Sequence, residues 1–495
     1  MKNITLKTLV LTALLLHSRA TATVHYVDLN NPNPTPPFTD WSTATTSIQD
    51  AVDVSVDGDQ VLVTNGIYAT GGANFPWTNL TYRVVVTNAV AVQSVNGPLV
   101  TVIDGSGAVG GVYLTNGCVL SGFTITHSLN GGGVFCGSDL DADYNLLPQA
   151  ARVINCQIVS NYSLSYISPG VSFAIVSNST ISKNTGHYAQ GGGADNCTIF
   201  NSVISQNAGM PASFNSGAAY GSILYNCLVC SNIAHGAYSC YLNNCLVVSN
   251  SYYGTPSCWV TNCTVCGNQR GGDDNTSTIW NSIFYYNGGG GLLRGSYCCS
   301  ESFGYANQSD GSITNAPMFV NMAAGDFHLA SNSPCINAGN NAEVIGSTDY
   351  DGNARIVGGT VDMGAYEYQS PSSMLSYAWA QQYHLPTDGS ADFADLDGDG
   401  MNNWQEWIAG TNPTNAASVL KMYSPTNRPA GLVVSWQVVS NRTYYLQRAT
   451  NLVGPGAFII IASNLTKQAK SIQFTDTTAT AQAPRFYRVG VQTSP

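Results

Sequence analysis

Between residues 155 and 287, the hydrophobic and polar positions of the chain repeat one short phrase. An asparagine is followed by two residues, an aliphatic residue or phenylalanine, two more residues and a second asparagine. The intervals between successive phrases are 23, 23, 25, 18, 18 and 19 residues. A period of about 20 residues that varies this much is typical of a solenoid whose coils differ in their loops. The phrase begins at Asn155, Asn178, Asn201, Asn226, Asn244, Asn262 and Asn281.

Each phrase predicts a short strand followed by a turn. Its second and fourth positions recur with a period of two and form an inward face, so Cys245 and Val247 should face the interior of a coil. The closing asparagine suits a left-handed turn, because its short amide tolerates a positive φ. In stacked parallel coils, these amides would bond one another in a ladder and satisfy buried backbone groups. The predicted ladder residues are Asn161, Asn184, Asn207, Asn232, Asn250 and Asn268.

Both ends of the repeat carry sequences that would close a solenoid. Residues 47–54 predict a short amphipathic helix, and residues 58–68 a first strand. The repeated asparagine phrase resembles the right-handed parallel β-helix of the pectin-lyase-like superfamily, and the GGA phrase at 192–194 resembles a repeat of bacterial polymorphic surface proteins. Residues 47–68 are similar to the entry of many secreted bacterial β-helices. Residues 326–340 and 349–368, which contain DMGAYEY, are similar to a terminal region of such proteins. The resemblance covers residues 24–369 and implies the fold rather than an activity.

The expected fold class is all-β, with three parts. A right-handed parallel β-helix solenoid with its caps is assigned to residues 23–369, a calcium-loop helical linker to 370–418 and a small antiparallel β-sandwich to 419–495. Residues 1–22 predict a signal peptide, because two lysines precede an apolar stretch and an Ala-Thr-Ala cleavage site. No later segment reaches the roughly 20 apolar residues of a membrane-spanning helix. We therefore expect a secreted monomer, either extracellular or on the cell surface.

Composition narrows the classes of function. Charged residues make up 9% of the chain, and the formal net charge is −11. Nucleic acid is excluded as a partner, because its binding requires clustered lysine and arginine. The ample apolar and aromatic residues argue against disorder. A weakly charged column rich in Asn, Ser, Thr and Tyr offers hydrogen bonds and ring faces to sugars. The expected partner is thus an extracellular polysaccharide or a cell-surface glycan.

All 14 cysteines lie between Cys118 and Cys335, inside the predicted column. Cysteines at matching positions of adjacent coils point the same way, about 4.8 Å apart. That spacing exceeds the usual Cβ separation of a disulfide, and cysteines two coils apart are too distant to share one zinc ion. Inward thiols that fill a narrow core are the preferred interpretation. The adjacent pair Cys298 and Cys299 is not explained by this stacking, and its redox state stays open.

The most specific local motif begins at residue 395, beyond the column. Positions 1, 3, 5, 9 and 12 carry oxygen ligands, position 6 is glycine, and position 7 offers a backbone carbonyl. This spacing matches an EF-hand-type loop for Ca²⁺ that leads into a helix at 403–409. A preceding helix is expected at 374–383, and the unit is similar to a dockerin or thrombospondin-type calcium linker. The predicted ligands are Asp395, Asp397, Asp399, Met401, Asn403 and Glu406.

A second acidic cluster at Asp349, Asp351 and Asn353 lacks a glutamate at the calcium-loop offset. A turn closed by Arg355 against Asp362 or Glu367 is the preferred interpretation.

In the C-terminal part, strands are expected at 432–439, 443–448, 457–462 and 485–491, which suits a small β-sandwich.

The evidence for catalysis is sparse. A lyase that acts on uronates needs a cation for the carboxylate and a base for the C–H proton. The candidates are Arg270, Asp273, Asp274 and Arg294, and a solvated loop is the preferred interpretation of each acid. The preferred function is carbohydrate binding, adhesion or support, with a structural calcium site that stiffens the joint between two domains. The alternative is a polysaccharide lyase or glycoside hydrolase, and whether the chain is an enzyme stays open.

Overall fold

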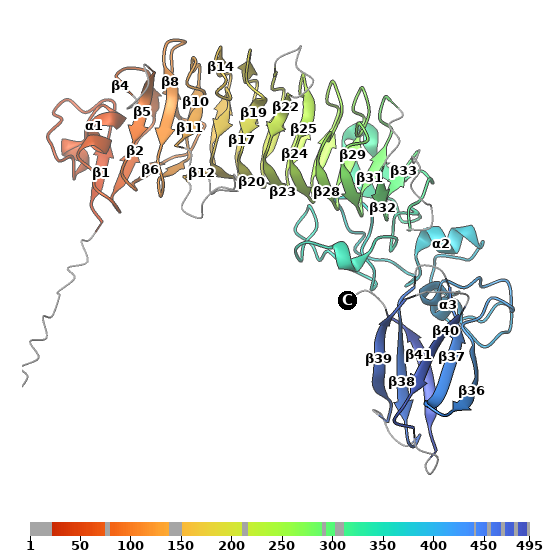
Figure 1. Cartoon of the computed structure of the whole chain (residues 1–495). Helices are drawn as coiled ribbons and strands as arrows, with labels where there is room; N and C mark the ends of the chain where they lie inside the picture. The colour runs from red at the N-terminus through yellow and green to blue at the C-terminus, as the bar shows by residue number, and fades with distance from the viewer. Residues whose placement is uncertain are drawn as a thin grey trace, which may run out of the picture.

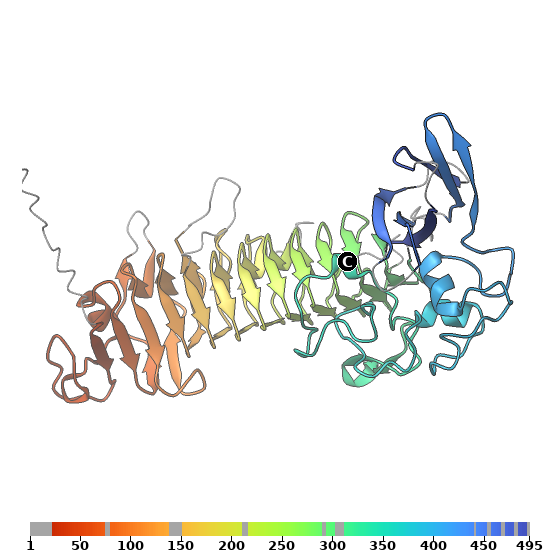
Figure 2. The same ribbon diagram turned by 90° about the horizontal axis from the view of Figure 1, so that it is seen from below.

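The chain winds into a long right-handed parallel β-helix, and small antiparallel sheets lie near its far end (Figures 1 and 2). The computed structural model describes residues 22–74, 80–137, 151–209, 216–289, 294–301, 311–439, 442–452, 457–466, 471–479 and 484–492. The predicted signal peptide therefore lies outside the described residues, apart from residue 22. No helix in the described ranges is long and apolar enough to cross a membrane.

Three sheets form the walls of the β-helix, and successive coils pair in parallel. The twelve-stranded sheet contains β1 (Val24–Val27), β2 (Gln60–Val63), β6 (Ala91–Ser94), β9 (Val119–Ser121), β12 (Arg152–Ile154), β16 (Ile175–Ser177), β20 (Thr198–Phe200), β23 (Ile223–Tyr225), β26 (Tyr241–Asn243), β28 (Trp259–Thr261), β30 (Thr278–Trp280) and β32 (Gly295–Ser296). The eleven-stranded sheet contains β3 (Gly66–Tyr68), β7 (Thr101–Asp104), β10 (Thr124–Thr126), β13 (Gln157–Val159), β17 (Thr180–Ser182), β21 (Val203–Ser205), β24 (Leu228–Cys230), β27 (Leu246–Val248), β29 (Thr264–Cys266), β31 (Ile283–Tyr285) and β33 (Cys299–Ser300). The eight-stranded sheet contains β4 (Ala73–Asn74), β5 (Thr81–Val86), β8 (Gly110–Leu114), β11 (Val134–Cys136), β15 (Val171–Ser172), β19 (Gly191–Asp195), β22 (Gly217–Tyr220) and β25 (His235–Tyr238). A short pair, β14 (Tyr162–Ser163) and β18 (Thr185–Gly186), lies beside them.

The closing asparagines lie in one file along the column. Each Nδ2 donates to the Oδ1 of the next asparagine, over 3.0 Å from Asn161 to Asn184 and 2.9 Å from Asn250 to Asn268. Each Oδ1 also accepts the backbone N–H of the previous asparagine, as Asn250 does from Asn232. The file continues through Asn207 to Asn287, and the residues from Asn161 to Asn268 are at most 1% exposed. Buried turn backbone is thereby satisfied without water.

The expected left-handed conformation of the closing asparagines is wrong. The residue before each of them adopts it instead, for example Ser231 with φ 56° and Ser249 with φ 58°. The opening asparagines, such as Asn226 with φ 52°, form a second left-handed corner. The closing asparagine itself does not adopt a positive φ, and its side-chain amide points inward to the ladder. The left-handed corner therefore lies one residue earlier.

The stacked cysteines form hydrogen bonds in addition to filling the core. The backbone N–H of Cys227 donates to Sγ of Cys245, and that of Cys245 donates to Sγ of Cys263, over 3.4 and 3.3 Å. Serine occupies the same position in neighbouring coils, where the N–H of Cys263 donates to Oγ of Ser282. Both side chains can accept a backbone N–H, which explains why cysteine and serine interchange here. These thiols form hydrogen bonds, not disulfides.

The N-terminal end is closed by α1 (Ile48–Asp53), preceded by the short helix η1 (Trp41–Thr43). The Ser47 side chain caps α1 by accepting the N–H of Asp50, and Ile48 and Val52 pack into the core. The single strand expected at 58–68 is instead divided into β2 and β3. Gly66, with φ 153°, lies at this corner between two sheets.

The far end is covered by a cap that contains β34 (Phe319–Asn321), η3 (Met322–Ala324), β35 (Asp326–Leu329) and η4 (Asn341–Glu343). Phe327 and Tyr366 of the cap pack on Leu246 and Val248, which would otherwise face solvent from β27. This contact explains why all three residues of β27 are buried although the strand pattern predicts alternation.

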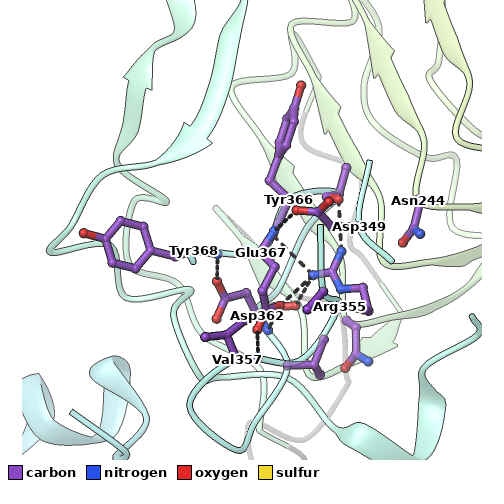
Figure 3. Close-up of polar contacts among 12 residues, drawn as sticks. Asn244, Asp349, Arg355, Val357, Asp362, Tyr366, Glu367 and Tyr368 are labelled. Carbon is purple, nitrogen blue, oxygen red and sulfur yellow. Dashed lines mark hydrogen bonds and ion pairs between the residues drawn. The ribbon is translucent and has the colours of Figure 1, made fainter. Parts of the chain in front are cut away.

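A buried polar network holds the cap together (Figure 3). Arg355 donates to Glu367 Oε2 over 3.2 Å, and both side chains are at most 1% exposed. Its other partners are backbone carbonyls, including that of Asp362. The Asp349 carboxylate accepts the backbone N–H groups of residues 351, 353 and 367. The acidic cluster is thus a turn, and Arg355 closes it on Glu367.

The segment after the cap contains α2 (Tyr377–Gln382) and α3 (Asn403–Ala409). The helix expected at 374–383 begins only at Tyr377. The Ser376 side chain caps it by accepting the backbone N–H of Trp379. Two three-stranded antiparallel sheets follow: β36 (Met422–Arg428), β37 (Gly431–Gln437) and β40 (Ser471–Asp476), then β38 (Tyr444–Ala449), β39 (Ile459–Leu465) and β41 (Phe486–Val491). Trp436 and Tyr444 pack between the sheets in one core. The sequence analysis did not predict β36 and β40. Exposed residues in both segments obscure the alternation of apolar and polar positions that identifies a strand.

Candidate metal centre and surface site

The loop before α3 gathers three carboxylates. One oxygen each from Asp395, Asp397 and Asp399 lies within 4.8 Å of the others. Backbone N–H groups hold the loop: Asp395 accepts from Gly398 and Gly400, and Asp399 accepts from Met401 over 2.8 Å. Glycine is required at 398 and 400, where φ is 77° and 94°. The loop therefore brings together acids that would repel one another without a cation.

Several oxygens around this loop are buried and accept no hydrogen bond from the described residues. They are Oδ2 of Asp397, Oδ2 of Asp399, Oδ1 of Asn403 and Oε2 of Glu406. Glu406 is 0% exposed and Asn403 is 1% exposed, so solvent does not reach these two side chains. Buried polar atoms normally have partners, and oxygens in this arrangement suit a hard cation.

Glu406 lies close enough to the acidic loop to be affected by its charge. Burial and the carboxylates of Asp397 and Asp399 raise the pKa of Glu406 to about 7. The backbone supports this position, because α3 begins at Asn403 within a capping box formed by Asn402 and Gln405. The donor set consists of oxygens alone, which favours Ca²⁺ over transition metals.

In the described part of the chain, no ion pair joins Arg270 or Arg294 to Asp273 or Asp274. Asp273 is buried and accepts from the backbone N–H of Asn275 and Ser277 and from the Ser277 hydroxyl. Burial raises the pKa of Asp273 to about 6. Asp274 accepts from the Thr276 hydroxyl. The Arg270 guanidinium lies 4.8 Å from the Tyr252 ring centroid, and Arg294 is exposed.

A row of side chains that the sequence patterns did not indicate begins on the eight-stranded sheet and continues along the column beyond β25. Asp195, Tyr220 and Tyr238 occupy the same register in β19, β22 and β25. The rings of Tyr220 and Tyr238 stack at 5.9 Å, and His235 lies 5.8 Å from Tyr238. The row continues through Tyr252 and ends at exposed Arg270. We call it the Asp195–Arg270 stripe, and its members are Asp195, Tyr220, Tyr238, His235, Tyr252 and Arg270.

Asp195 differs from the other acids of the column. It lies on the outward side of β19, next to the core residue Ala194, and it accepts a hydrogen bond from Asn196 Nδ2 over 3.0 Å. Burial alone raises the pKa of Asp195 to about 6. The signal in the sequence is its place directly after the GGA phrase, where a core strand ends. A raised pKa on an outward position marks a candidate functional residue.

Comparisons with known proteins yield structural similarity alone. Pectate lyase Pel9A aligns over 70% of this chain and 97% of its own, with 17% identity and a TM-score of 0.44. XylC in complex with xylose aligns over 70% and 98%, with 8% identity and a TM-score of 0.40. A rhamnogalacturonan lyase aligns over 56% and 73%, with 12% identity and a TM-score of 0.28. No protein-family model and no curated protein matches the sequence.

Proposed function

We propose that this chain is an exported β-helix protein that binds an extracellular polysaccharide without cleaving it. The observation that carries the proposal is the Asp195–Arg270 stripe. It places phenol, carboxyl and guanidinium groups along one side of the column, with the buried His235 ring packed against Tyr238 and Tyr252. The four steps of about 4.8 Å between five successive coils give a row about 19 Å long, which suits an extended glycan chain. Export is proposed from the signal-peptide pattern of residues 1–22.

Binding is favoured over cleavage because the stripe contains a single carboxylate, Asp195. Glycoside hydrolysis requires two carboxyl groups on opposite sides of the bond. Asp273 could supply another acid, but three hydrogen bonds from its own turn occupy it. Asp195 can accept a hydrogen bond from a sugar hydroxyl, and Arg270 can pair with an anionic sugar substituent.

The alternative function is a uronate lyase, in which Arg270 would neutralise the substrate carboxylate. Arg270 is exposed, and a ligand can approach its guanidinium from the side away from Tyr252. The purified protein should be incubated with uronate polymers and calcium while the absorbance of unsaturated chain ends is followed. We expect no increase. A calcium-dependent increase that Arg270→Ala abolishes would establish the lyase instead.

We further propose that the acidic loop binds Ca²⁺ as a structural ion. Asp395, Asp397, Asp399, Asn403 and Glu406 would supply side-chain oxygens, and Met401 its backbone carbonyl. The buried oxygens without partners support this assignment. Calorimetry on the mature chain should detect calcium binding, and the Asp397→Ala, Glu406→Ala double variant should lose it. Equal heats for both proteins would contradict the site.

A further inference from the structure

Met401 contacts both the acidic loop and the C-terminal sandwich. Its backbone N–H donates to Asp399 Oδ1 over 2.8 Å, within the loop. Its Sδ accepts the backbone N–H of Leu420 over 3.4 Å, and the Leu420 side chain packs on the sandwich core. One residue thus connects the proposed calcium site with the first residues of the sandwich.

Helix α3 makes a second connection to the sandwich. The Arg442 guanidinium donates to the Trp407 carbonyl over 3.2 Å. Glu406, a proposed calcium ligand, lies one residue before Trp407 on the same helix. The position of this helix therefore affects both the calcium site and the contact with Arg442.

The opposite side of the loop is attached to the cap of the column. The backbone N–H groups of Asn403 and Trp404 donate to the carbonyls of Ala394 and Asp392, each over 2.8 Å. The Asp392 carboxylate accepts from Ser373, whose carbonyl in turn accepts from Asn337 Nδ2 of the cap. The loop and α3 thus lie between two parts of the chain that have separate hydrophobic cores.

The contact with the sandwich is incompletely packed. A cleft of about 670 Å³ separates α3 from β38 and β41. Its walls include Met401, Trp404 and Ile408 on one side, and Leu420, Tyr445 and Val489 on the other. A contact held by few hydrogen bonds across a cleft is easily released. A small change in free energy can therefore determine whether the sandwich is docked against α3.

We propose that calcium occupancy determines whether the C-terminal sandwich is docked against α3. This inference rests on the calcium site proposed above. Without a cation, repulsion among Asp395, Asp397 and Asp399 strains the loop that fixes Met401. With calcium, Met401 and Glu406 are held in their observed places, and the contacts of Leu420 and Arg442 form with them. Because calcium binding requires this loop geometry, it favours the docked state.

The test is small-angle X-ray scattering of the mature full-length chain, in calcium and after chelation, with calorimetry on the same samples. We expect chelation to increase the radius of gyration of the wild type. Arg442→Ala removes the contact with the Trp407 carbonyl and changes none of the proposed ligands, so it should bind calcium and lose the calcium-dependent shift. Arg428→Ala, at an exposed arginine of β36, is the matched control and should keep that shift.

The outcomes separate the two proposals. If calcium binds but the wild-type scattering does not change, the coupling is wrong and the calcium site stands. If Arg442→Ala keeps the full shift, the coupling through the contact between α3 and Arg442 is wrong. If calorimetry shows no calcium binding to the wild type, both proposals fail.

Discussion

Each ladder asparagine satisfies polar groups of two neighbouring coils at once. Asn232 Oδ1 accepts both the backbone N–H and the side-chain Nδ2 of Asn207, and its own Nδ2 donates to the Ile204 carbonyl. Water does not reach these groups. Removing one side chain therefore leaves its former partners buried without a hydrogen bond, at the full free-energy cost of their desolvation.

Asn232→Ala should therefore destabilise the column by at least about 2 kcal/mol, because each buried group left unpaired costs about 1–3 kcal/mol. Denaturant unfolding, followed by circular dichroism, measures the change. Asn96→Ala, at an exposed turn, is the control and should change stability by less than about 0.5 kcal/mol. Equal effects of the two substitutions would contradict the role of the ladder.

His328 connects two acids of the cap. Its Nδ1 lies 2.6 Å from Asp326 and its Nε2 lies 2.7 Å from Asp351. Partial burial lowers the pKa of His328, but the hydrogen bonds to Asp351 and Asp326 outweigh it, so the net pKa is raised. The folded state therefore binds this proton more tightly than the unfolded state does.

The stabilisation by His328 should be complete below pH about 6.5 and lost as the pH rises through the raised pKa. Since the ring is half exposed, we expect a loss of at most about 1 kcal/mol. Thermal unfolding at several pH values should show this decrease in the wild type and a flatter profile in His328→Gln. Parallel profiles would show that the histidine does not contribute.

At the scale of elements, the cap shows how a buried ion pair fixes a loop without regular structure. Arg355 donates to three carbonyls and to Glu367, while Glu367 also accepts the backbone N–H groups of Val357 and Asp362. Removing either partner leaves a charge in a site that water does not reach.

Arg355→Ala should destabilise the cap by about 3–5 kcal/mol, because Glu367 then stays buried without its cation. Limited proteolysis should cleave residues 311–369 faster, while cleavage in the coils stays unchanged. In the double variant Arg355→Ala, Glu367→Ala, the second substitution should cost much less than it does alone. Additive losses would argue against a direct pair.

The elements differ in how far the sequence predicts them. The period of the asparagine phrase predicted the stacked coils, because each coil repeats the same local hydrogen bonds. The cap network depends on contacts between Arg355 and distant backbone carbonyls, which spacing does not reveal. Only the pairing of Arg355 with Asp362 or Glu367 was expected, and Glu367 is the carboxylate partner.

The site residues show the same division. The acidic loop is local, so the offsets within one short motif suffice to predict that Asp395, Asp397 and Asp399 lie close together. The Asp195–Arg270 stripe joins residues of different coils, and their alignment depends on the register of coils of unequal length. Sequence alone singled out Arg270 but not Asp195 or Tyr238.

At the scale of the whole molecule, the acidic loop and α3 lie between the β-helix with its cap and the two C-terminal antiparallel sheets. The stripe begins on the eight-stranded sheet, whereas the cap packs on the outward side of the eleven-stranded sheet. The proposed glycan-binding residues and the cap therefore lie on different faces of the column.

Affinity electrophoresis in gels that contain acidic polysaccharides tests the binding proposal most directly. We predict that the wild type is retarded, and that Tyr220→Ala and Arg270→Ala each weaken binding about tenfold, equivalent to about 1.4 kcal/mol. Tyr241→Ala, an exposed tyrosine on the twelve-stranded sheet, should bind as the wild type does. No retardation of the wild type by any polysaccharide, or equal losses in all three variants, would contradict the account.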